Sequence, residues 1–280
     1  MLRKTLVLLV LIAAGLLVLA ACTPAAAPDP EGCLGTAADA IVDLNCEEVT
    51  IAVENAYIPF NYVRLDSLEA EGWDYDAWNE ICTRLHCTPK YVEAGWEGMI
   101  QAVADGQFDA AADGITITPD RAEIVDFSIG YINVDQRLLV RLGEDRFSSI
   151  EEFAANPDLV MGTQTGTTNY ETAVKYLPED RVKAFEQFPF AVQALIAGDV
   201  DAVIIDETAG QGYKGENADT LELIGPSISS DKLGFIYPKG SELREPVDQA
   251  LQSMMQDGTL NDLNVEYFGP SFNLTYDEIQ

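Results

Sequence analysis

Residues 108–123 constrain the fold more than any other part of the sequence. The apolar, alanine-rich run Phe108–Ala112 predicts a buried strand. Pro119 suits the first position of a helix, and Thr118 suits the capping position just before it, so a helix should begin here. A strand, a turn and a helix start in this order are typical of an open α/β sheet, in which ligands bind at the carboxyl ends of the strands.

The turn carries polar groups that would suit a zwitterion. The guanidinium of Arg121 can hold a carboxylate through two parallel hydrogen bonds, and the hydroxyl of Thr116 can add another. Asp113 can accept a hydrogen bond from an ammonium group. A free amino acid carries both groups, so these residues predict an amino-acid site. The alternative is a surface ion pair between Arg121 and Asp120 or Glu123, because such pairs are common and weak.

The N-terminus has the composition of a targeting segment. Within residues 1–22 a basic start is followed by the apolar run Leu6–Leu19, and Leu19-Ala20-Ala21-Cys22 matches the bacterial lipoprotein signal. We therefore expect a signal peptide that is cleaved before a lipidated Cys22. The alternatives are an ordinary secretory peptide and an uncleaved membrane anchor.

The next segment, residues 23–45, is expected to be a tether. It begins with the alanine- and proline-rich stretch Thr23–Glu31, which is typical of a disordered linker. No later run is apolar and long enough to span a bilayer. The mature chain is therefore expected to be an extracytoplasmic module, in the periplasm or on the outer face of the membrane, held there by its lipid.

The chain is strongly acidic, with a formal net charge of -31 at pH 7. This charge excludes nucleic-acid binding as a main role, because the phosphate backbone would be repelled. It does not exclude small anions, because one local arginine can overrule the average field. A solvated acidic surface is the simplest explanation of the charge.

The cysteines predict disulfides and no metal site. If Cys22 is lipidated, the cysteines that remain are Cys33, Cys46, Cys82 and Cys87. An even number in an oxidising compartment predicts two disulfides, for which three pairings are possible. Zinc binding is the alternative, but the paired Cys-x-x-Cys spacing is missing and His86 is the only histidine. We place His86 at the surface.

Hydrophobic periodicity predicts alternating strands and helices along the rest of the chain. The expected strands are 49–54, 89–92, 108–112, 136–141, 159–162 and 200–205. The expected helices are 74–85, 97–104, one beginning at 119, 147–156, 170–176, 191–197, 245–257 and a last one ending near residue 268. This alternation predicts an α/β fold.

Several short motifs occur in a fixed order along the chain. They are Tyr57-Ile58-Pro59-Phe60, Gly72-Trp73-Asp74-Tyr75-Asp76, Gly95-Trp96-Glu97-Gly98-Met99-Ile100, Thr116-Ile117-Thr118-Pro119-Asp120-Arg121 with Val125-Asp126-Phe127-Ser128, Gly166-Thr167-Thr168, and Asp206-Glu207. In this order they resemble motifs of the extracellular solute-binding proteins of amino-acid ABC transporters, the family 3 group with the glutamine-, histidine- and lysine/arginine/ornithine-binding proteins. The resemblance runs from about Val49 to about Phe268.

The resemblance implies a two-lobed type II periplasmic-binding-protein fold, in which each lobe is a mixed sheet flanked by helices. Lobe 1 would comprise residues 46–135 and 238–280, and lobe 2 would comprise residues 136–237 with a hinge strand at each end. Two crossings between lobes make a hinge that closes on a ligand. The resemblance also implies a monomer that delivers its ligand to an ABC permease without a cofactor. It favours the pairs Cys33–Cys46 and Cys82–Cys87.

The resemblance also assigns ligand contacts to this chain. From lobe 1 they are Glu54, Tyr57, Trp96, Asp113, Gly114, Thr116 and Arg121, and from lobe 2 they are Gln164, Thr167, Thr168 and Asp206. Arg121 and the loop Gly166-Thr167-Thr168 would hold the ligand carboxylate, and Asp206 would hold its ammonium group. The alternatives are a helix cap for Asp206 and a core-edge aromatic for Tyr57.

The acids and aromatics of this set favour a basic ligand, arginine first. Glu54 and Asp113 add negative charge where one acid suffices for the ammonium group, and Trp96 and Tyr57 can stack on a guanidinium. Relatives often carry serine or alanine at the position of Asp113. Asp113 can therefore take over the ammonium contact instead, which leaves a polar neutral ligand such as glutamine as the alternative.

An enzyme on the same fold, a cyclohexadienyl dehydratase, is the alternative to a binding protein. It would need a positioned general acid, for which Glu171 and Glu207 are the available candidates. A sensory domain is a third class, but no signalling module is recognisable in the sequence. We expect a binding protein and no catalysis.

Overall fold

The computed structural model describes residues 29–269 and residue 272. The predicted signal segment 1–22, with Cys22, lies outside the described residues. Gly32 and the later described residues belong to one structural unit. None of the helices in the described part of the chain is long and apolar enough to cross a membrane.

The first lobe is built on a mixed five-stranded sheet. Strand β1 (Glu48–Val53) is parallel to β5 (Thr88–Glu93) and β6 (Ala110–Ala111), whereas β14 (Ile236–Pro238) runs antiparallel between β6 and β7 (Val125–Phe127). The last three residues of β1 and both residues of β6 are fully buried, as expected for strands covered on both faces.

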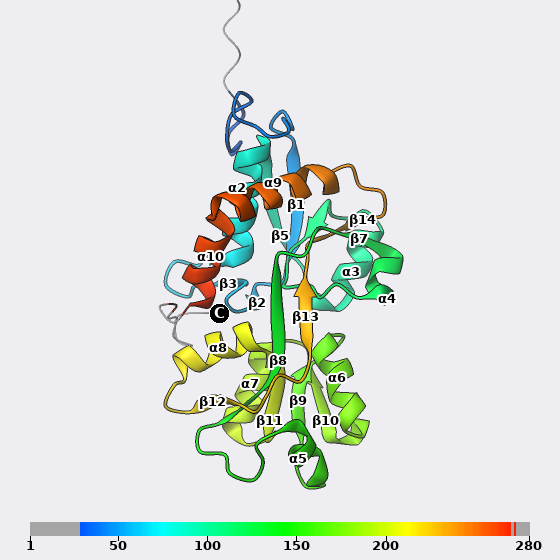
Figure 1. Ribbon diagram of the computed structural model, residues 1–280, viewed down its shortest axis with the longest axis vertical. Coiled ribbons are helices and arrows are strands. Elements are labelled where there is room, and N and C mark those ends of the chain that lie inside the picture. Colours follow the sequence, from blue (N-terminus) through cyan, green and yellow to red (C-terminus); the bar gives the residue numbers. More distant parts are fainter. Residues whose placement is uncertain (1–28, 270–271, 273–280) are drawn as a thin grey trace, which may run out of the picture. The chain divides into compact units, whose positions relative to one another are not determined.

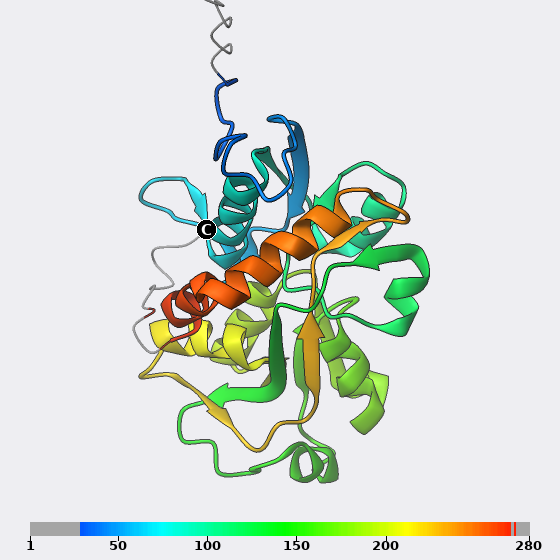
Figure 2. The same ribbon diagram turned by 45° about the horizontal axis from the view of Figure 1, so that its top comes forward.

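The described part of this lobe contains four longer helices. They are α2 (Trp73–Leu85), α3 (Trp96–Ala104), α9 (Arg244–Asp257) and α10 (Thr259–Phe268). Trp78, Ile81, Cys82 and Leu85 of α2 are fully buried, and α2 packs against α9 and α10, which lie together in Figure 2. A short helix, α4 (Pro119–Ile124), begins where the sequence predicts, with Thr118 as its cap. A small antiparallel sheet of β2 (Ala56–Tyr57), β3 (Asn61–Val63) and β4 (Ala70–Glu71) was not predicted.

The second lobe is built on a six-stranded sheet. Its strands are β8 (Ile132–Arg141), β9 (Met161–Gln164), β10 (Val182–Phe185), β11 (Ala202–Asp206), β12 (Leu221–Ile224) and β13 (Ser230–Leu233). Their order is β10-β9-β11-β8-β12, and β13 pairs with β8. The helices are α5 (Ile150–Ala155), α6 (Thr168–Tyr176), α7 (Phe188–Ala197), α8 (Glu207–Glu216) and a 3-10 turn, η1 (Glu179–Arg181).

Strands β8 and β13 connect the two lobes. The first part of β8, Ile132–Asp135, pairs with β13, and from Gln136 onward β8 pairs with β11 and β12. Figure 1 shows the two strands side by side between the sheets. The predicted architecture of two α/β lobes joined by two hinge strands is therefore confirmed, whereas the residue boundaries of the lobes remain a prediction.

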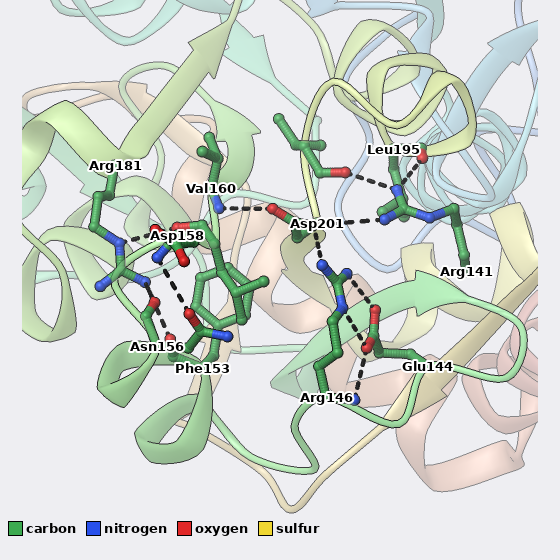
Figure 3. Close-up of polar contacts among 12 residues, drawn as sticks. Arg141, Glu144, Arg146, Phe153, Asn156, Asp158, Val160, Arg181, Leu195 and Asp201 are labelled. Atoms are coloured by element: carbon green, nitrogen blue, oxygen red, sulfur yellow. Dashed lines mark hydrogen bonds and ion pairs between the residues drawn. The ribbon is translucent and has the colours of Figure 1, made fainter.

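A cluster of arginines holds the far end of the second lobe together (Figure 3). Arg146 pairs with Asp201 at 2.7 Å, and the other carboxylate oxygen of Asp201 accepts a hydrogen bond from the N–H of Val160 at 2.9 Å. Val160 and Asp201 directly precede β9 and β11. These contacts fix the alignment of the two strands whose opposite ends carry Gln164 and Asp206.

Both disulfides implied by the resemblance are present, Cys33–Cys46 and Cys82–Cys87. The segment after Cys33 is packed on the lobe, because the N–H groups of Leu34 and Leu44 donate to the carbonyl oxygens of Cys87 and Leu85 at 3.0 and 2.9 Å. The described part of the predicted tether is therefore structured from Cys33 onward.

The prediction of a surface position for His86 was wrong. His86 is 4% exposed. Its Nδ1 lies 2.8 Å from Oδ1 of Asp43, and its Nε2 lies 3.1 Å from Sγ of Cys46. The disulfide-linked segment covers the imidazole, and this contact is separated by about forty positions in sequence, so local periodicity could not reveal it.

Candidate functional site

A cavity between the two lobes contains about 310 Å³ of space, part of it open to solvent. It is lined by Glu54, Tyr57, Trp96, Asp113, Gly114, Thr116, Arg121, Gln164, Thr167, Thr168, Asn169, Phe188 and Asp206. The structure thus brings all eleven predicted contact residues to one place.

The carboxyl ends of the strands explain why these residues meet. Glu54 directly follows β1, and Asp113 lies two residues after β6. In the second lobe Gln164 is the last residue of β9, and Asp206 is the last residue of β11. Parallel strands end at the same edge of a sheet, so each lobe presents its polar side chains along one edge.

Arg121 is positioned by the start of α4 and by contacts from both lobes. Its Nη1 donates to the carbonyl oxygen of Thr116 at 3.0 Å, and its Nη2 lies 3.4 Å from the carbonyl oxygen of Gly166. The guanidinium carbon lies 5.2 Å from the centre of the Trp96 ring. Burial lowers the pKa of Arg121, but the group stays cationic in the whole accessible pH range.

Arg121 forms no ion pair with a carboxylate among the described residues. The surface pairs with Asp120 or Glu123, considered as the alternative, are therefore not formed there. A partly buried guanidinium whose protein contacts are neutral carbonyl and aromatic groups leaves donors for an anion. Arg121 is accordingly suited to a ligand carboxylate.

Asp206 is held by neutral donors. Its side chain is buried and accepts hydrogen bonds from Oη of Tyr57 at 2.6 Å and from Nδ2 of Asn169 at 3.0 Å. Burial raises the pKa of Asp206 to about 6 against the effect of these two hydrogen bonds. Asp206 occupies the N-cap position of α8, as the helix-cap alternative predicts, but its carboxylate makes no capping hydrogen bond to the helix.

Glu54 and Asp113 form an acidic pair on the first lobe. Glu54 is 5% exposed and accepts a hydrogen bond from Nε2 of Gln164 at 2.9 Å, across the interlobe cavity. Asp113 is 4% exposed and accepts one from Nδ2 of Asn61 at 2.8 Å. Burial raises the pKa of both carboxyl groups, and the charge of Asp113 raises that of Glu54 further.

No lysine or arginine forms an ion pair with either acid within the described part of the chain. Ionised carboxyl groups are costly to bury without a cation, and two close together are costlier. Asn61 also donates to the buried Asp74 at 2.9 Å, so a further acid stands behind the pair. This corner of the cavity therefore has a strong preference for a cation.

The two lobes touch each other around the cavity. Oγ1 of Thr116 lies 3.3 Å from Oγ1 of Thr168. Together with the Tyr57–Asp206 and Glu54–Gln164 hydrogen bonds, this contact describes a closed arrangement. The hydroxyl of Thr167, in contrast, makes its hydrogen bonds within the second lobe. It donates to the carbonyl oxygen of Gln164 at 2.7 Å and caps α6.

Sequence reasoning missed two lining residues, Asn169 and Phe188. Asn169 directly follows the motif Gly166-Thr167-Thr168, in the first turn of α6, and its amide donates to Asp206. Phe188 stacks on Tyr57, with ring centres 5.4 Å apart, and no local pattern marks it. The acids considered for an enzyme, Glu171 and Glu207, do not line the cavity, and Glu207 pairs with Arg137 at 2.9 Å.

Comparisons with known proteins identify the family of this chain. The sequence model of the family described as "Bacterial extracellular solute-binding proteins, family 3" matches residues 49–270. A relative named "Putative amino-acid ABC transporter-binding protein PatH", from Vibrio harveyi, is 26% identical over 79% of this chain and 89% of its own length.

Two solved structures are similar over most of their length. The chain is 30% identical, with a TM-score of 0.74, to "An ancestral arginine-binding protein bound to arginine", over 79% of this chain and 98% of that one. It is also 30% identical, with a TM-score of 0.72, to the ancestral amino acid-binding protein AncCDT-1, described as a precursor of cyclohexadienyl dehydratase, over 79% and 95%.

Proposed function

The chain belongs to family 3 of the bacterial extracellular solute-binding proteins, and from this premise we propose that it binds a free cationic amino acid, arginine first. In this proposal the ligand closes the two lobes, and the closed form delivers it to the permease of an amino-acid ABC transporter. The lipid on Cys22 would keep the chain at the membrane, where it would act as a monomer.

The observation that carries the proposal is the distribution of charge in the cavity. An arginine without an ion-pair partner among the described residues lies at one side, and the buried acids Glu54 and Asp113 lie without a cation at another. A ligand with a carboxylate and a distant cation would neutralise both sides at once. Arginine has this form.

The α-amino group has a separate acceptor in this proposal. Asp206 is oriented by Tyr57 and Asn169 and retains acceptor capacity toward the cavity. The carboxylate of the ligand would bind Arg121 together with Thr116 and the start of α6, where free amide groups favour an anion. The guanidinium would then extend between Trp96 and Tyr57 toward Glu54.

A thermal-shift screen against the twenty amino acids and ornithine tests the proposal. A ligand that binds only the folded chain raises the melting temperature by mass action, by about 5–10 °C at roughly one hundred times its Kd. We expect this shift with arginine, lysine and ornithine. Equal shifts of the melting temperature with neutral amino acids would contradict the preference for a cationic ligand. Glutamine would then be the stronger candidate.

Ligand affinity should fall as the pH is lowered from 8 to 5. The ligand ammonium binds the ionised form of Asp206, whose pKa burial raises to about 6. The contribution of Asp206 is present above this pH and is lost below it, by about tenfold per pH unit. Protonation of Glu54 and Asp113, whose pKa values burial raises to about 8 and about 7, weakens binding of the side-chain cation in the same direction from about pH 8 downward. Calorimetric titrations with arginine at pH 5 and pH 8 measure the effect. Affinity that is constant between them would contradict it, and Asp206→Asn should give weaker binding with a shallower pH dependence.

The dehydratase alternative is favoured by one observation, the similarity to AncCDT-1. Neither candidate acid, Glu171 or Glu207, lines the cavity. Release of carbon dioxide from prephenate or arogenate by the purified chain would establish this alternative. We expect none.

A further inference from the structure

A group of three side chains lies outside the ligand cavity, at the point where the end of the predicted tether meets the first lobe. Its members are Asp43, His86 and Cys46. Oδ1 of Asp43 lies 2.8 Å from Nδ1 of His86, and Nε2 of His86 lies 3.1 Å from Sγ of Cys46. Sγ of Cys46 is bonded to Cys33. A carboxylate thus orients an imidazole whose other nitrogen faces one sulfur of a disulfide.

This geometry favours Cys46 over Cys33 as the leaving sulfur when the disulfide is cleaved. A carboxylate on Nδ1 fixes the ring and stabilises its protonated form, and a protonated histidine beside a sulfur stabilises the thiolate. In thiol–disulfide exchange the sulfur with the more stable thiolate leaves faster. Asp43 is itself held ionised, because hydrogen bonds from the N–H of Asn45 and from His86 lower its pKa.

We propose that Cys33–Cys46 is a thiol-exchange site, at which an incoming thiolate attacks Cys33 and Cys46 leaves toward His86. A bond forms between the incoming sulfur and Sγ of Cys33, and the Cys33–Cys46 bond breaks. The electron pair passes to Sγ of Cys46, which accepts a hydrogen bond or the proton from Nε2 of His86. A second thiolate then attacks the mixed disulfide, so Cys33 is released and two thiols are oxidised to one disulfide.

The second disulfide provides an internal comparison. Cys82 and Cys87 are fully buried, whereas Cys33 and Cys46 are only half-buried. Among the described residues, an imidazole approaches Cys46 and none approaches Cys82 or Cys87. The substrate class is a thiolate small enough to reach a half-buried sulfur. The inference does not depend on the identity of the ligand in the interlobe cavity.

The test compares His86→Asn with the wild-type chain. His86 has a left-handed backbone, with φ of 52°, and asparagine tolerates this conformation better than other polar residues. The oxidised chain is treated with dithiothreitol at constant pH, alkylated, and analysed by mass spectrometry for each disulfide. We expect His86→Asn to slow reduction of Cys33–Cys46 on the order of tenfold, the effect of raising the leaving thiol's pKa by about two units. The rate at Cys82–Cys87 should stay unchanged.

Slower reduction cannot come from damage to the fold, because loosening this corner would expose the disulfide and accelerate its reduction. An unchanged or faster rate at Cys33–Cys46 would overturn the proposal. Asp43→Asn keeps the imidazole and removes the group that stabilises its charge, so it should slow the reaction in the same direction. It also provides the test if His86→Asn fails to fold.

A second measurement locates the bond that forms. With 2-mercaptoethanol, a monothiol, the trapped mixed disulfide should lie mainly on Cys33, which peptide mapping can show. An adduct mainly on Cys46 would mean that Cys33 is the leaving group, and it would contradict the role given to His86.

Discussion

Replacing Arg121 with alanine is expected to abolish most of the affinity for arginine. Arg121 is the cation that the account assigns to the ligand carboxylate, and removing one member of a desolvated charge pair costs about 2–5 kcal/mol. The Kd should therefore rise by at least about 30-fold. Isothermal titration calorimetry at pH 8 measures the change.

Arg64→Ala is the matched control for this prediction. It removes the same charge from an arginine of the first lobe that pairs with Asp66 and Glu71 and does not line the cavity. Its Kd should stay within about twofold of the wild-type value, as is usual for exposed ion pairs. Near-unchanged affinity in Arg121→Ala would refute the role of Arg121.

Glu54→Gln is expected to change ligand preference. Glutamine can still accept the hydrogen bond from Gln164, but it removes the negative charge that the account assigns to the ligand's side-chain cation. A hydrogen bond to a charged group contributes about 1.5–3 kcal/mol, so arginine affinity should fall by about 10- to 100-fold. Any affinity for glutamine should stay the same or rise. Competition titrations with the two ligands measure the ratio.

Glu97→Gln is the control for this second prediction. Glu97 is exposed and follows Trp96 directly, but it does not line the cavity. Both variants lose one negative charge, so a loss of arginine binding in Glu97→Gln would point to the general acidity of the chain.

The ligand-free Glu54→Gln chain should melt no lower than the wild type, because it no longer buries that charge beside Asp113.

The central unit of the site could be predicted because its determinants are local. Thr118 and Pro119 set the start of α4, and the start of α4 sets the position of Arg121. Glu54 and Asp206 directly follow or end apolar strands, which places them at a sheet edge. The family resemblance was needed to predict which loops of the two lobes come together.

The parts that were missed depend on contacts between distant segments. Phe188 reaches the cavity only because α7 packs against β2 of the other lobe. His86 is buried because the disulfide-linked segment folds back over it. The amide of Asn61, which holds Asp113 and Asp74 together, lies on a three-residue strand too short for periodicity to indicate.

The position of a bound ligand is best tested by a crystal structure of residues 23–280, the predicted mature chain without its lipidated Cys22, with bound arginine. The account predicts the α-carboxylate on Arg121, the α-ammonium group on Asp206 and the guanidinium within hydrogen-bond distance of Glu54. A guanidinium that lies on Asp206, or one directed away from both Glu54 and Asp113, would contradict it. So would crystals that hold no arginine in the cavity at a saturating concentration.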